Sequence, residues 1–199
     1  LYPFQNRVDM DAYKLHRYCN ETYMPKPLPV IYNTWMSRFD DISYDLLAQQ
    51  LPLARDMGME YFVIDAGWFG EPFRWHASVG DWREYTQAGM AGRMQEFAGL
   101  VRQNGMKFGL WFEIERASLE SAAYKAHPEY YLVESGKAFL DFAREDARQY
   151  ALDTVTENIE RYGIKYIKFD FNGTITYDAR VEAFLPYFRG YGEFIRRLR

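Results

Sequence analysis

Lys168, Asp170 and Asn172 occupy every second position of a short, otherwise apolar run near the end of the chain. In an extended strand alternate side chains share a face, so these three would project together. The ammonium group would hold a neighbouring carboxylate ionised, and the amide can both donate and accept hydrogen bonds. A buried strand seldom carries three polar groups on one face. The pattern therefore indicates either a functional site at a strand end, or a strand that stops at Asp170 before a polar loop.

Apolar runs and helical patterns alternate along the chain. Strands are predicted at 30–35, 60–66, 107–112 and 165–170. Helices are predicted over about 43–58, 92–104, 119–126, 144–162 and 178–198, and a short one around Asp9–Tyr18. Ser43 and Ser118 are the expected N-caps, and Pro52 is expected to kink or shorten its helix.

A hairpin is predicted where 130–133 and 138–142 flank a four-residue turn. Without it, the order is strand then helix, four times over, which predicts a parallel sheet covered by helices. We expect an α/β fold, a (β/α)8 TIM barrel of which about the first four βα units lie in residues 29–199. Residues 1–28 read as a lead-in or linker. The rival is a doubly wound sheet, but no glycine-rich phosphate loop follows the first strand.

The predicted strand ends all carry polar or aromatic side chains, and the active site of a (β/α)8 barrel lies at that end. They are Asn33 and Trp35, Asp65 and Trp68, Trp111 and Glu113, and the three residues named first. Four units would leave two sheet edges and an apolar interior uncovered. We therefore expect a partner, the remaining half of the barrel. The start at Leu1 instead of Met favours a longer chain over a second copy as its source.

Composition excludes several classes of partner. The net charge is −4, which provides no electrostatic footprint for nucleic acid or an anionic membrane. No window approaches a membrane span, and no signal peptide is visible, so we expect a cytoplasmic protein. Cys19 is the single cysteine, and the three histidines are scattered, so neither a metal nor another cofactor is expected. Aromatic residues reach 19%, which suits sugar rings and ordinary cores alike.

The strand ends resemble those of the α-galactosidases of glycoside hydrolase family 36, the melibiase type. The resemblance runs in order from about 29 to 172 through Asn33-Thr34-Trp35, 62–70, Gly80-Asp81-Trp82, 105–113, Ala126-His127-Pro128, Leu140-Asp141 and 166–172. It implies retaining hydrolysis of a glycoside or oligosaccharide through a covalent glycosyl-enzyme, a role in which a carboxylate can attack and then leave.

By the same resemblance Asp170 is the nucleophile. Trp35, Asp65, Trp68, Trp111, Lys168 and Asn172 are the expected sugar-binding residues. The family's general acid/base is an aspartate on a later strand, so this chain alone is expected to be inactive. Glu113 and Glu115 are the alternative source of a second carboxylate, with structural or binding roles as the competing interpretation.

Two departures from the family pattern concern sugar recognition. The second aspartate of Asp-Asp-Gly-Trp is Ala66 here, and the family's arginine and glutamine are Ser135 and Lys137. Because a site built to bond a hydroxyl discriminates strongly through it, these changes indicate a different sugar preference. A transglycosylase that builds raffinose-type oligosaccharides and a non-catalytic sugar-binding barrel remain the alternative functions.

Overall fold

The computed structural model describes residues 7–23, 28–170 and 181–199. The chain divides into two compact units, Leu1–Val30 and Ile31–Arg199. In the first, helix α1 spans Arg7–Tyr23 and is longer than the expected helix over 9–18. Among the described residues, no helix is both long enough and apolar enough to cross a membrane.

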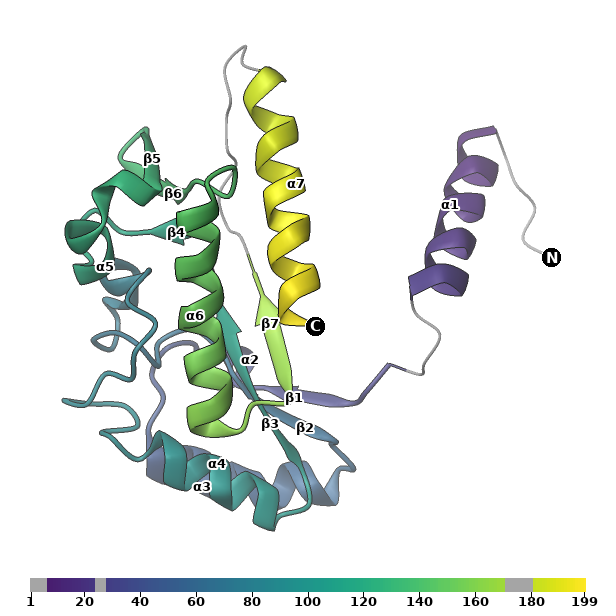
Figure 1. Ribbon diagram of the computed structural model, residues 1–199. Coiled ribbons are helices and arrows are strands. Elements are labelled where there is room, and N and C mark those ends of the chain that lie inside the picture. The colour runs from purple at the N-terminus through teal and green to yellow at the C-terminus, as the bar shows by residue number, and fades with distance from the viewer. Residues whose placement is uncertain (1–6, 24–27, 171–180) are drawn as a thin grey trace. The chain divides into compact units, whose positions relative to one another are not determined.

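The second unit is built on a parallel sheet of four strands (Figure 1). The strands are β1 (Ile31–Asn33), β2 (Tyr61–Ile64), β3 (Lys107–Phe112) and β7 (Tyr166–Phe169), in the order β1-β2-β3-β7. This confirms the predicted parallel α/β class. Spatial order follows chain order across these strands, without the reversal that defines a doubly wound sheet.

The register brings the strand ends to a common edge. Asn33 is opposite Val63, and Ile64 is opposite Leu110. On the other side of β3, Trp111 is opposite Lys168 and Phe112 is opposite Phe169. Parallel strands place their carboxyl ends together, so the residues that follow β1, β2 and β7 meet beside the end of β3.

Four longer helices accompany the sheet strands, with two shorter helices at the loops (Figure 1). They are α2 (Trp35–Arg38), α3 (Tyr44–Asp56), α4 (Met94–Gln103), α5 (Ala122–Ala126), α6 (Glu145–Tyr162) and α7 (Val181–Leu198). Ser43 caps α3 by accepting a hydrogen bond from Leu46 N at 3.3 Å, as predicted. The α6 helix ends at Gly163, whose φ of 65° is the left-handed conformation of a helix C-cap.

Pro52 does not break its helix, because α3 continues through it to Asp56. A proline removes one backbone hydrogen bond and crowds the preceding turn, at a cost of about 3 kcal/mol. Leu47, Leu51 and Ala54 are each at most 1% exposed, so the packing on both sides of the proline offsets that cost.

The segment between β3 and α6 differs from the prediction at two points. Helix α5 begins at Ala122 and is capped by Ser121, whose Oγ accepts from Tyr124 N, whereas Ser118 caps only a turn. The predicted hairpin is present as β5 (Tyr131–Glu134) and β6 (Lys137–Leu140). A third strand, β4 (Arg116–Ala117), pairs with β6. It was not predicted, because a strand of two residues carries no periodic signal in the sequence.

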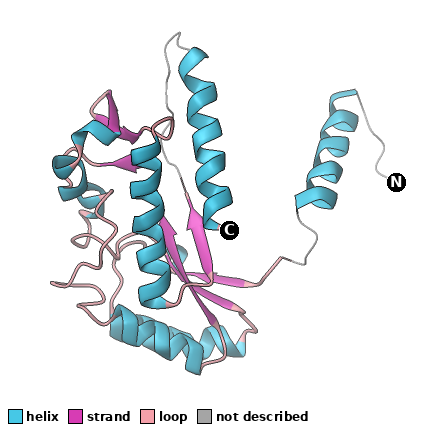
Figure 2. Cartoon of the chain, in the orientation of Figure 1, coloured by secondary structure: helices cyan, strands magenta, loops and turns pink. Residues whose placement is uncertain are grey.

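Most of the segment between β2 and α4 is loop, as Figure 2 shows, with one short 3-10 helix at Trp75–Ser78. Its aromatic side chains fill the core, and Trp68, Phe69 and Trp82 are at most 3% exposed. Gly67, at φ 100°, lies so close to Asp40 that an added Cβ would be 2.9 Å from the Asp40 Cβ. This close approach fixes the loop against the chain that leaves α2.

Candidate active site

Asp65 is the centre of a polar cluster at the carboxyl edge of the sheet. It follows β2 and is 3% exposed. Its Oδ2 accepts from Asn33 Nδ2 at 2.6 Å and from Lys168 Nζ at 2.9 Å, and its Oδ1 accepts from Ala66 N at 2.9 Å. A carboxylate this deeply buried requires such donors to stay charged.

Lys168 links Asp65 to Asp170. Its Nζ is 3.2 Å from Asp170 Oδ2, and the Lys168 and Asp170 side chains are 35% and 34% exposed. Burial lowers the Lys168 pKa, but hydrogen bonds and charge attraction from Asp65 and then Asp170 outweigh it, so the pKa is raised overall. The ammonium group is therefore charged at neutral pH and stands beside two carboxylates.

Trp111 supplies a second donor to Asp170. Its Nε1 is 3.1 Å from Asp170 Oδ2, and the Asp170 backbone N–H donates to Phe112 O at 2.9 Å. The Asp170 main chain is thereby bonded to β3, and its side-chain Oδ2 accepts from two donors, Lys168 and Trp111. Such a carboxylate is oriented and stabilised as an anion without being sealed from solvent.

Trp68 and Trp111 are both 1% exposed. Trp68 donates its Nε1–H to the Trp111 carbonyl at 2.9 Å, and the Phe69 ring stacks on Trp111 with centroids 5.9 Å apart. Trp68 therefore supports Trp111 from inside the core, and Trp111 reaches the site through its N–H. A direct sugar contact by either ring stays a prediction.

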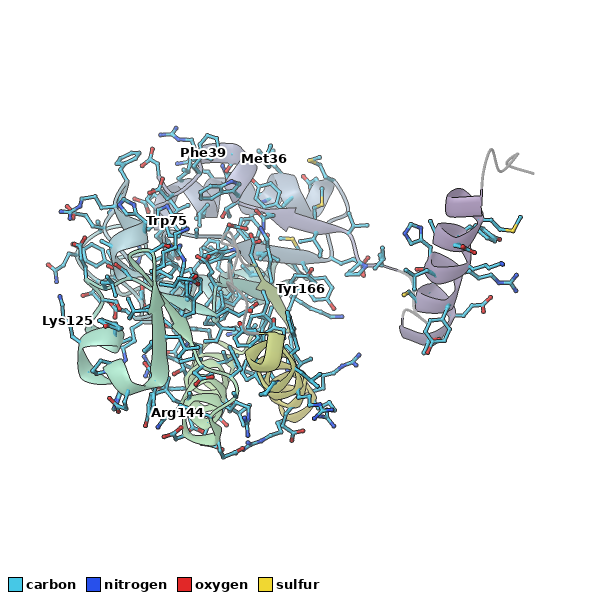
Figure 3. The ribbon with its side chains drawn as sticks, turned by 90° about the horizontal axis from the view of Figure 1, so that it is seen from above. Met36, Phe39, Trp75, Lys125, Arg144 and Tyr166 are labelled. Carbon is cyan, nitrogen blue, oxygen red and sulfur yellow. The ribbon has the colours of Figure 1, made fainter. Side chains whose placement is uncertain are left out.

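Trp35 is half-buried at the start of α2. Its ring meets Phe39 edge-on at 5.3 Å and Trp75 edge-on at 6.2 Å. Met36 on α2 and Phe39, which follows the helix, point outward (Figure 3) and are 85% and 60% exposed. Trp35 is instead packed against neighbouring aromatic rings, and a sugar contact by its ring stays a prediction.

The structure brings together Trp35, Asp65, Trp111, Lys168 and Asp170 of the residues selected from the sequence, through direct contacts or shared neighbours. Asn172 lies outside the described residues. Ala66 is 2% exposed and has no acceptor to offer beside Asp65. Ser135 lies in the exposed turn of the β5–β6 hairpin with a φ of 50°.

The sequence placed Asn33 at a strand end and Asn33-Thr34-Trp35 in the resemblance, but it indicated no specific contact for Asn33 or Thr34. Thr34 is fully buried, and its Oγ1 accepts from Asp65 N at 3.0 Å. Asn33 donates to the Asp65 carboxylate and accepts from Trp35 N at 2.9 Å. The available signal was their position, since both polar residues stand at the carboxyl end of a predicted strand.

Glu113 and Glu115 follow β3 but have partners of their own. Glu113 is fully buried and pairs with Arg116 Nη2 at 2.7 Å. Glu115 accepts a hydrogen bond from the Tyr187 hydroxyl of α7. Burial raises the Glu115 pKa, and the nearby Glu113 charge adds to it, against the lowering effect of Tyr187. These contacts favour structural roles for both.

Within residues 7–23, 28–170 and 181–199, no three histidine, cysteine or acidic side chains group closely enough to hold a metal ion. The cluster at the carboxyl edge contains an oriented carboxylate, an ammonium group and an indole N–H. The fold and this site define a parallel α/β domain with a lysine–carboxylate cluster at the carboxyl edge of its sheet.

Comparison with known proteins identifies the family. Residues 7–183 match the family model described as Melibiase, so the chain belongs to the melibiase family. It is 32% identical over 186 residues to alpha-galactosidase Mel36A of Lactobacillus acidophilus, covering 85% of this chain and 25% of that protein. It is 29% identical over 196 residues to the bifunctional alpha-galactosidase/sucrose kinase AgaSK of Mediterraneibacter gnavus, covering 90% of this chain and 20% of that one.

Solved structures agree on the fold. The galactosidase domain of AgaSK matches with a TM-score of 0.78 and 28% identity, over 89% of this chain and 26% of the other. The alpha-galactosidase from Lactobacillus brevis matches with a TM-score of 0.74 and 28% identity, over 90% and 26%. The α/β fold is thus similar to that of the catalytic domains of family 36, which confirms the resemblance. The chain spans about a fifth to a quarter of the length of the curated relatives it matches.

Proposed function

We propose that this chain contributes the nucleophile half of a retaining glycosidase acting on terminal α-linked sugars, with Asp170 as the nucleophile and α-galactosides as the first substrates to test. The observation that carries the proposal is the Asp170 carboxylate. It lies at the carboxyl edge of the sheet, one-third exposed, with Lys168 and Trp111 both donating to Oδ2. The names of the relatives supply the substrate class, because Mel36A and AgaSK are alpha-galactosidases.

In the proposed reaction an Asp170 oxygen forms a bond to the anomeric carbon while the bond to the leaving oxygen breaks. The electron pair stays on the leaving oxygen, which takes a proton from a general acid. Water then attacks the same carbon while giving a proton to the conjugate base of that acid, and the Asp170 carboxylate leaves with its electrons. The net stereochemistry at the anomeric carbon is retained because it inverts twice.

The surrounding residues prepare Asp170 for this role. Lys168 and Trp111 both donate to Oδ2, which orients the carboxylate. The second carboxyl group, about 5–5.5 Å away in retaining enzymes, would come from outside Leu1–Arg199. The four-stranded sheet would form half of a (β/α)8 barrel, and the same outside segment would supply the remaining strands.

The test is Asp170→Asn in the full-length protein, assayed on p-nitrophenyl α-galactoside and on raffinose. Raffinose is a suitable oligosaccharide to test because a doubly substituted variant of a fold neighbour, alpha-galactosidase AgaA of Geobacillus stearothermophilus, has been crystallised with it. We expect kcat to fall by more than about a thousandfold, since the amide cannot form the covalent intermediate. Wild-type turnover by this variant would sink the assignment.

Rescue by a small anion distinguishes a lost nucleophile from a damaged fold. In Asp170→Gly, azide can occupy the vacated space and attack the activated substrate from the Asp170 side. The product would be the β-galactosyl azide, with configuration opposite to that of the substrate. The α-azide, or no rescue despite normal folding by circular dichroism, would count against Asp170 as the nucleophile.

A further inference from the structure

Asn33 stands at the head of a chain of contacts that ends on Asp170. Its amide bonds to the Asp65 carboxylate at 2.6 Å, Asp65 bonds to Lys168 at 2.9 Å, and Lys168 is 3.2 Å from Asp170. This series of contacts crosses the sheet from β1 to β7 through Asp65, which follows β2.

The orientation of the Asn33 amide is determined by its two partners. The Trp35 backbone N–H can only donate, so it must face Asn33 Oδ1, at 2.9 Å. An ionised carboxylate can only accept, so Asp65 must face Asn33 Nδ2. The amide group therefore fits between a fixed donor and a fixed acceptor, which a hydroxyl or a carboxylate cannot do in the same way.

Asn33 and Lys168 share one acceptor, Asp65 Oδ2. The other oxygen, Oδ1, is engaged by Ala66 N, and the Asp65 backbone N–H is engaged by Thr34 Oγ1. With its main chain and Oδ1 engaged, the Asp65 carboxylate has Oδ2 as the acceptor that Asn33 and Lys168 share. The Asn33 amide is 2.6 Å from this oxygen and the Lys168 ammonium is 2.9 Å from it, so both donors bear on where Oδ2 lies.

We infer that Asn33 is a positioning residue, which sets the Lys168 ammonium beside the Asp170 carboxylate by fixing where Asp65 Oδ2 lies. The inference rests on the proposed role of Asp170. In this inference Asp65 positions Lys168, in addition to making the sugar contact expected of it. Asn33 itself does not touch the reacting atoms.

The first variant is Asn33→Ala in the full-length protein. It leaves Asp65 Oδ2 with Lys168 alone, so the lysine is drawn toward Asp65 and away from its working position. Small misplacements of groups near the reacting atoms are costly, and we expect kcat to fall by about 10–100-fold. KM for p-nitrophenyl α-galactoside should also rise, because Asp65 and Lys168 are expected sugar contacts, but by a smaller factor than the loss in kcat.

The second variant, Asn33→Asp, preserves shape and tests the donor directly. The new carboxyl group would face the Asp65 carboxylate. Lys168 contacts the same Asp65 carboxylate, and Asp170 contacts Lys168. When protonated it can donate to Asp65 as the amide does, and when ionised it repels Asp65. The ratio of variant kcat to wild-type kcat should therefore be highest at acid pH and should fall as the pH rises.

Asn158→Ala is the matched control. Asn158 is 5% exposed and donates Nδ2 to Trp82 O and Thr154 O, so the variant also loses a buried amide. It should lower the melting temperature while leaving kcat within about twofold when assayed well below that temperature. A role for Asn33 in stability alone would make Asn33→Ala behave the same way.

Three results would overturn the inference. They are a kcat of Asn33→Ala within twofold of wild type, a loss confined to KM, and an Asn33→Asp ratio that does not change with pH. The Asp170→Asn experiment keeps the two proposals apart. An active Asp170→Asn variant removes the nucleophile assignment, whereas an inactive one beside a fully active Asn33→Ala variant removes Asn33 alone.

Discussion

The Lys168 ammonium shows how burial and charge compete at one residue. Burial alone would lower its pKa, yet Asp65 and Asp170 raise it. A lysine with a raised folded-state pKa contributes its full stabilisation below its unfolded pKa of about 10.4 and loses it as the pH rises through the higher value. The ammonium that stands between the two carboxylates is therefore charged at neutral pH and above it, up to the raised pKa.

Glu115 provides the opposite case and a prediction. Its pKa is raised by burial first, so the ionised form is the costly one in the folded protein. Glu115→Gln keeps an oxygen for the Tyr187 hydroxyl and removes the charge. We expect a higher urea midpoint than wild type at pH 7. The gain should vanish as the pH falls through the raised folded pKa towards the unfolded value of about 4.3.

The same variant tests Glu115 as a source of the second catalytic carboxylate. If Glu115 is structural, Glu115→Gln in the full-length protein keeps kcat within a few-fold of wild type. A thousandfold loss without loss of folding would place Glu115 in the reaction and change the proposed division of the site.

At the scale of the elements, α7 packs against the body of the unit through a glycine. Tyr187 and Phe194 on this helix are 1% exposed, and the Phe142 ring meets both. A Cβ on Gly190 would collide with the Phe142 carbonyl oxygen and lie 2.6 Å from its carbon. The Phe142 carbonyl also accepts from Arg148 Nη1 at 2.7 Å, so it cannot move freely.

Gly190→Ala should therefore destabilise the unit by about 2–3 kcal/mol, as overpacking of a rigid contact does. Gly192 lies in the same helix, and a Cβ there would meet nothing within 4 Å. Gly192→Ala should stabilise by about 0.5–1 kcal/mol, the helix propensity difference. Chemical denaturation of both variants measures the contrast, and equal effects would contradict this packing of α7.

At the scale of the whole molecule, the β7 side of the sheet presents an apolar groove of about 500 Å³. It is lined mainly by aliphatic and aromatic side chains of α6, β7, α7 and the α6–β7 loop, including Ile159, Ile164, Ile167, Phe169, Ile195 and Leu198. Within the described part of the chain, β1 and β7 are the two ends of the sheet. An open edge beside an apolar groove is a surface on which a further strand can pair.

The 199-residue chain by itself should accordingly bind anilinonaphthalene sulfonate and associate as its concentration rises. Ile195→Glu with Leu198→Glu should cut the dye fluorescence at least about twofold, because charges in the groove oppose apolar binding. Val133→Glu is the control, since Val133 is an exposed hydrophobe (53%) outside the groove. If the groove variant and the Val133→Glu control lost dye fluorescence equally, the dye would bind outside the groove.

Local patterns in the sequence determined the elements of this protein. The four apolar runs became the four parallel strands, and the Ser43 cap and the glycine at 163 marked real helix ends. These signals succeed because strand and helix periods, caps and left-handed glycines act over a few residues. The ends of the strands also indicated Asp65, Trp111, Lys168 and Asp170 as one group, since parallel strands share a carboxyl edge.

The tertiary structure decided which of these groups bond and which are buried. Trp35, Trp68 and Trp111 all stand at or near the ends of predicted strands, so the sequence does not distinguish them. Packing places Trp68 and Trp111 in the core and leaves Trp35 half-buried. Asn33 meets Asp65 across 32 residues of chain, and Lys168 meets Asp65 across 103. Such contacts depend on strand register and side-chain rotamers, and no local pattern specifies either. For that reason the chemistry could be predicted from residue types, while the hydrogen bonds that orient it required the folded sheet.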